Sequence, residues 1–200
     1  MNEKEKNDLD FSFSIENLIG TISSSISTSD KTVKERLEKF RIEFNKKFVA
    51  SEEKTIAEII TQKYLFLALV AYAIYLPSLA VIEIHSTLER LIINETAREI
   101  GKKSRNKFFL KLIERNNINE LSKILKKLDF LDKDDLKFIK ELNKLRNAIA
   151  HKNPIKISNI LNSGRETPIE ELDMLLLDID CIPLIIGVCN IIVKLVKKYN

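Results

Sequence analysis

The chain has 200 residues, of which 44% are hydrophobic and 31% are charged, a composition typical of one globular domain. Four glycines and four prolines are too few for the tight turns of β-sandwiches, barrels and propellers, and no two glycines are close enough to form a phosphate-binding loop. Two cysteines and two histidines are too few for an ordinary Cys/His zinc site, so we expect no metal and no cofactor. Since the polar N-terminus also lacks an apolar signal segment, we expect a cytoplasmic protein.

The hydrophobic pattern predicts an all-α chain, with no period-two strand pattern. We expect residues 1–29 to form a polar, serine-rich arm or docking segment and residues 30–200 to form a single all-helical domain. The predicted helices cover residues 30–48, 51–76, 77–100, 117–128, 132–150 and 180–198, with a basic helix after Gly101, which we expect to stop the helix before it. Residues 155–170 are expected to form a loop.

The segment Tyr64–Ile82 has 19 residues without a formal charge and is long enough to span a bilayer. Pro77 interrupts it, however, and the positive residues on its two sides show no bias that would orient a span. Its alanines suit close packing in a helical core. We therefore expect a buried central helix and no membrane contact, with a membrane-attached helical scaffold as an alternative.

The positive charge is concentrated in the second half of the chain. The net charge is −3 over residues 1–100 and +7 over residues 101–200, with most of the excess between Lys102 and Lys127. Such a stretch favours a polyanionic partner, although a solvated lysine-rich surface explains the same charge.

One polar group lies near the end of the predicted helix 132–150. At 100° per residue, Leu142, Leu145 and Ile149 share one side of this helix, whereas Asn147 and His151 share the opposite side. Arg146 lies on the flank of the apolar stripe. This polar group therefore faces solvent or a second subunit, unless Arg146 and His151 are simply cations favoured by the helix dipole.

The segment Arg146-Asn147-Ala148-Ile149-Ala150-His151 resembles the signature of the HEPN superfamily (higher eukaryotes and prokaryotes nucleotide-binding domains). That signature is an Arg, four to six intervening residues of which the first is often Asn, and a His, at the end of a late helix. The resemblance covers roughly residues 50–198. It implies a HEPN-like helical bundle that forms a two-fold homodimer, in which two motifs meet in one cleft.

The resemblance also implies a metal-independent endoribonuclease. In this interpretation His151 exchanges a proton with the 2′-hydroxyl or the leaving 5′-oxygen, Arg146 binds the phosphate, and Asn147 holds His151 or a phosphate oxygen. The product is a 2′,3′-cyclic phosphate. Such proteins act as toxins, in antiviral defence or in RNA processing, so an inhibitory protein partner or an activating signal is expected. The main alternative is a non-catalytic RNA- or nucleotide-binding or dimerisation module.

Several basic side chains are further candidates for holding the RNA backbone. They are Lys102, Lys103, Arg105, Lys107, Lys111, Lys144 and Lys152. The second histidine, His85, has Glu89 one turn later; we expect a packed or surface pair, although a pair that assists catalysis is an alternative. Cys181 and Cys189 are expected to be buried apolar residues.

Overall fold

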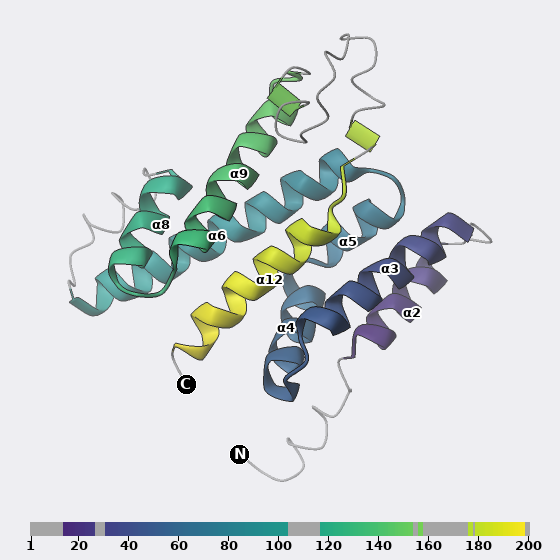
Figure 1. The fold of residues 1–200 in the computed structure, drawn as a ribbon, viewed down its shortest axis with the longest axis horizontal. Coiled ribbons are helices and arrows are strands. Elements are labelled where there is room, and N and C mark those ends of the chain that lie inside the picture. The colour runs from purple at the N-terminus through teal and green to yellow at the C-terminus, as the bar shows by residue number, and fades with distance from the viewer. Residues whose placement is uncertain are drawn as a thin grey trace.

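The computed structural model describes residues 14–26, 31–103, 117–153, 156–157, 176–177 and 179–198. Across these ranges the regular structure is helical, without a strand, which confirms the predicted all-α class for this part of the chain (Figure 1). The main helices are α2 (Ile15–Ser25), α3 (Lys31–Lys47), α4 (Ser51–Tyr64), α5 (Phe66–Ala73), α6 (Pro77–Lys103), α8 (Ile118–Lys127), α9 (Lys133–Ala150) and α12 (Ile182–Lys197).

The centre of the bundle is α12, which packs against α3, α4, α6 and α9. Figure 1 shows it between α9 and α3. Since a helix with neighbours on several sides must be apolar around most of its circumference, half of its 16 residues are buried. Cys181 and Cys189 are among the buried residues, as predicted. Burial raises the pKa of both thiols to about 12, so neither is reactive near neutral pH.

The segment expected to be an arm or docking segment contains a helix, because Ile15–Ser25 is helical. Ile15, Leu18 and Ile22 recur at helical spacing and are buried, and α2 packs on α3. The hydroxyl of the exposed Ser24 donates to the carbonyl of Thr21 at 3.0 Å, a bond to the preceding turn that a serine in a helix commonly makes.

The predicted helix 51–76 is two helices, because the chain breaks at Leu65 between α4 and α5. The hydroxyl of Thr87 in α6 donates to the carbonyl of Tyr64 at 3.0 Å, so a neighbouring helix satisfies a carbonyl at the break. The two helices are bent by 75°. No single helix in the described ranges is long and apolar enough to cross a membrane, although α4 and α5 pass that test as a bent pair.

Pro77 begins α6, as the sequence predicted. The prediction that Gly101 ends this helix was wrong, because α6 continues through Gly101 to Lys103. A glycine inside a helix costs only about 1 kcal/mol relative to alanine, and packing outweighs that cost: α8 lies against α6 (Figure 1). The predicted basic helix after Gly101 and most of the predicted loop 155–170 lie outside the described residues.

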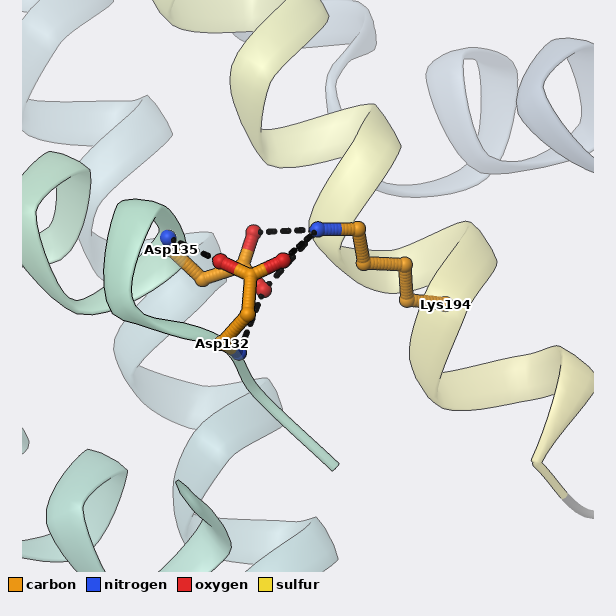
Figure 2. Close-up of polar contacts among 3 residues, drawn as sticks. All are labelled: Asp132, Asp135 and Lys194. Carbon is orange, nitrogen blue, oxygen red and sulfur yellow. Dashed lines mark hydrogen bonds and ion pairs between the residues drawn. The ribbon is translucent and has the colours of Figure 1, made fainter. Parts of the chain in front are cut away.

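The N-terminus of α9 is fixed by a capping box and an ion pair (Figure 2). The carboxylate of Asp132 accepts from the backbone N–H of Asp135 at 2.9 Å, and the carboxylate of Asp135 accepts from the N–H of Asp132 at 2.9 Å. The ammonium of Lys194 in α12 reaches both carboxylates, at 2.7 Å and 2.8 Å. These contacts give hydrogen-bond partners to backbone N–H groups at the start of α9 and attach this end of the helix to α12.

Candidate functional site

The motif occupies the last turn and the C-terminal end of α9. Leu142, Leu145 and Ile149 are buried, whereas Asn147 and His151 are exposed. The predicted orientation of this polar group, away from the apolar stripe, is therefore confirmed.

The position of His151 is set by the way α9 ends. His151 is the C-cap residue, and Lys152 follows it in the left-handed conformation at φ 47°. The N–H of Asn153 donates to the carbonyl of Ala148 at 2.9 Å, and that of Lys152 to the carbonyl of Ile149 at 3.0 Å. This pair of hydrogen bonds is a Schellman motif, formed here with lysine at the position where glycine is usual. It holds the backbone of His151 at the exposed end of a rigid helix.

Arg146 is half-buried, and its guanidinium donates a hydrogen bond to the side-chain oxygen of Asn147 at 3.1 Å. The side-chain nitrogen of Asn147 in turn donates to the side-chain oxygen of Asn143, one turn earlier, at 3.5 Å. No carboxylate in the described part of the chain forms an ion pair with this guanidinium. Arg146 is thus oriented by a neutral amide and keeps its full positive charge for an anionic ligand.

The second histidine lies on the other side of Asn143. His85, in α6, is 3% exposed, and its Nε2 donates to the side-chain oxygen of Asn143 at 3.0 Å. Its Nδ1 lies 3.9 Å from the carboxylate of Glu89, as expected for a packed pair, and is buried without a hydrogen-bond partner. Burial lowers the pKa of His85, against the opposing influence of Glu89 and Asn143, while the charge of Arg146 lowers it further. His85 is therefore neutral near neutral pH.

The link through Asn143 was missed by the sequence analysis. Asn143 precedes Asn147 by one helical turn, and that spacing was the available signal. Its contact with His85 joins residues 58 positions apart in the chain, so only the packing of α6 on α9 brings them together.

One chain does not bring Arg146 and His151 together on one face. His151 lies five positions after Arg146, which corresponds to about 140° around a helix and about 7.5 Å along its axis. No described hydrogen bond joins the two side chains. Within one chain, the two groups therefore start from different sides of the helix end.

The candidate RNA-binding basic residues that the structure describes are divided between two ends of the bundle. Lys144 and Lys152 are exposed and lie near the motif on α9. Because α6 and α9 run in opposite directions (Figure 1), the backbone of Lys102 and Lys103 lies at the far end of α6. Lys102 is about 25 Å along the helix from His85. Arg105, Lys107 and Lys111 lie outside the described residues.

Among the described residues, no group of three or more His, Cys, Asp and Glu side chains is arranged to hold a metal ion. Comparison of the chain with protein-family models, with curated proteins and with solved structures finds no match.

Proposed function

We propose that the protein is a metal-independent endoribonuclease of the HEPN type, active as a two-fold homodimer. The observation that carries the proposal is the geometry of the motif: Asn147 and His151 are exposed on one side of a helix end, and Asn147 accepts a hydrogen bond from Arg146. These are the groups that cleavage of RNA through its own 2′-hydroxyl requires.

The chemistry needs a proton carrier and a cation. An imidazole can take the proton of the 2′-hydroxyl or return one to the leaving 5′-oxygen. A guanidinium can bind a phosphate with two parallel hydrogen bonds and stabilise the charge that develops during the transfer. The bond from the 2′-oxygen to phosphorus forms as the bond to the 5′-oxygen breaks, leaving a 2′,3′-cyclic phosphate. In this proposal Lys144 and Lys152, both exposed, contact adjacent phosphates.

Arg146 and His151 lie on different sides of the end of α9 within one chain, and this arrangement supports a dimer. A two-fold axis beside the end of α9 would place the Arg146 of one protomer near the His151 of its partner. A cytoplasmic ribonuclease must be controlled, so the proposal includes an inhibitory protein partner or an activating signal, in a toxin, defence or RNA-processing role.

The separation of His151 from Arg146 also favours a second candidate function. This is a non-catalytic module that binds RNA or nucleotides through Arg146 and Asn147. The two functions separate in a parallel assay of affinity and cleavage on one labelled single-stranded RNA. A nuclease loses cleavage but keeps most of its affinity in His151→Ala, and loses both in Arg146→Ala. A binding module shows no cleavage in any form and loses affinity in Arg146→Ala.

The matched control for charge is Lys31→Ala, which removes an exposed lysine in α3 that pairs with Glu35 at 3.6 Å. This variant should bind and cleave as the unmodified protein does. Sedimentation at micromolar concentration completes the test, because a strictly monomeric chain that cleaves RNA would contradict a site built from two copies.

A further inference from the structure

A series of polar contacts runs from a buried histidine in α6 to the exposed motif on α9. It begins at His85, whose Nε2 donates to the Asn143 side-chain oxygen at 3.0 Å. That oxygen also accepts from Asn147 at 3.5 Å, and the oxygen of Asn147 accepts from Arg146 at 3.1 Å. Each side chain therefore fixes the orientation of the next, and the series ends at the cation proposed to bind phosphate.

The histidine at the start of this series is not explained by stability. His85 is 3% exposed, and its Nδ1 is buried without a hydrogen-bond partner, 3.9 Å from a carboxylate oxygen of Glu89. A buried polar atom without a partner destabilises a fold, and an apolar side chain of similar size would avoid that loss. The chain nevertheless has a histidine here, in contact with Asn143.

We propose that His85 and Asn143 are positioning residues: by holding the side-chain oxygen of Asn143, His85 sets the amide orientation of Asn147 and, through it, the direction of the Arg146 guanidinium. The amide of Asn147 can turn in two ways. With its nitrogen held by Asn143, its oxygen must face Arg146, and the guanidinium is then held by a neutral acceptor that leaves its charge available. Without Asn143, the amide can rotate and present its nitrogen to Arg146, donor against donor.

This inference rests on the proposed function, because positioning matters for catalysis only if Arg146 contacts a phosphate. Its test therefore includes a measurement on the protein without RNA. The variants are His85→Leu, which removes the donor, His85→Gln, which can restore one, and Asn143→Leu. The control is Thr87→Val, which removes a buried hydrogen bond from the same helix to the carbonyl of Tyr64, away from the motif.

The first readout is the side-chain amide signal of Asn147 in a proton–nitrogen NMR spectrum of the isotope-labelled full chain. We expect this signal to shift in His85→Leu and Asn143→Leu, to return toward its original position in His85→Gln, and to stay unchanged in Thr87→Val. An unchanged Asn147 signal in both leucine variants would overturn the proposal, whether or not the protein cleaves RNA.

The second readout compares stability with cleavage. We expect His85→Leu to unfold at the same temperature as the unmodified protein or higher, while its kcat falls about tenfold, the loss expected for one misplaced hydrogen-bonded group. The double variant with Asn143→Leu should lose no more than either single variant, because the two residues act through one contact. Independent, multiplied losses would overturn the proposal, and so would a fall in unfolding temperature with kcat unchanged.

The two proposals fail in different ways. If the unmodified protein cleaves no RNA while the Asn147 signal follows the expected pattern, the nuclease function is wrong and the positioning contact stands. If cleavage depends on Arg146 and His151 while the Asn147 amide signal does not shift in the His85 variants, the positioning role is wrong and the nuclease function stands. Should His85→Leu fail to fold, Asn143→Leu and His85→Gln carry the test, since Asn143 is only half-buried.

Discussion

The ammonium of Lys194 lies 2.8 Å from the carboxylate of Asp135, a side chain that is only 5% exposed. This contact joins the central helix α12 to the first turn of α9, and the same ammonium reaches Asp132 at 2.7 Å (Figure 2). The helix that carries the motif at one end is thus attached to the core at the other.

Replacing Lys194 by methionine keeps the length of the side chain and removes its charge. We expect the free energy of unfolding to fall by about 2 kcal/mol, less than for a fully buried pair because Lys194 is 38% exposed. Denaturant unfolding measures this change. Lys197→Met is the control, since the Lys197–Glu53 pair is more exposed on the carboxylate side, and it should change stability little. Equal effects of the two substitutions would contradict this role.

The same contact predicts a dependence on acid. Hydrogen bonds from Lys194 and from the Asp135 backbone lower the pKa of Asp132 to about 2, from an ordinary value of 3.8. A carboxylate with a depressed pKa stabilises the fold fully above its unfolded pKa, and this contribution is lost as pH falls toward 2. The unmodified protein should therefore lose stability between pH 4 and pH 2, and the loss should be smaller in Lys194→Met. Parallel curves for the two proteins would be inconsistent with the ion pair.

A second pH effect belongs to His85. Because burial lowers its pKa below the ordinary 6.5, the folded state binds a proton there less readily than the unfolded state does. The free energy of unfolding therefore keeps its full value above pH 6.5, where His85 is neutral in both states. It falls as the pH drops below 6.5 toward the pKa of His85 in the folded state. Unfolding measured between pH 7.5 and pH 5 should show this loss in the unmodified protein and a smaller loss in His85→Gln. Equal losses in the two proteins would contradict this role of His85.

At the Schellman motif that ends α9, we expect a substitution to raise the free energy of unfolding. Lys152 has φ 47°, a conformation that costs an L-residue about 1–2 kcal/mol and costs glycine nothing. Lys152→Gly should therefore raise the free energy of unfolding by about 0.5–1 kcal/mol, after allowance for the greater freedom of glycine in the unfolded chain. Lys152→Ala, which also removes the charge, should not stabilise. If alanine and glycine raise stability equally, the gain comes from the charge.

At Gly187, α12 packs closely against the Phe138 ring of α9. A Cβ built there would lie 2.5 Å from Cε2 of the Phe138 ring. Alanine gains about 1 kcal/mol in helix propensity over glycine, but overpacking typically costs 1–3 kcal/mol, so we expect Gly187→Ala to reduce the melting temperature. Phe138→Leu in the same chain should restore part of the loss. A higher melting temperature in Gly187→Ala alone would show that the ring moves aside.

Much of this fold is visible in the sequence. The helices predicted to begin near residues 77, 117 and 132 are present, and the structure adds side-chain caps by Asn117 and Asp132 at the last two. The break at Leu65 could not be predicted in the same way, since neither proline nor glycine marks it and the hydroxyl that satisfies the Tyr64 carbonyl comes from Thr87 in another helix. The prediction that Gly101 ends α6 was wrong for a related reason: the weak tendency of glycine to end a helix was outweighed by tertiary packing.

In the candidate site, too, some features could be predicted from the sequence and others depend on how the helices pack. The exposed side of α9 that carries Asn147 and His151 follows from helical periodicity alone. The contact between His85 and Asn143 does not, because it depends on the register between α6 and α9, which no local pattern specifies. The distance between Lys102 and the motif likewise depends on the opposite directions of these two helices.

The central claim is that Arg146 and His151 cleave RNA without a metal ion, and its most direct test is the chemistry of the products. Purified protein, His151→Ala and Arg146→Ala are each incubated with single-stranded RNA in excess EDTA, and the new 3′ ends are identified by mass spectrometry. We predict 2′,3′-cyclic phosphate ends from the unmodified protein and at least a hundredfold slower cleavage by each variant. Cleavage that stops in EDTA, that leaves 3′-hydroxyl ends, or that proceeds equally in all three proteins would contradict the claim.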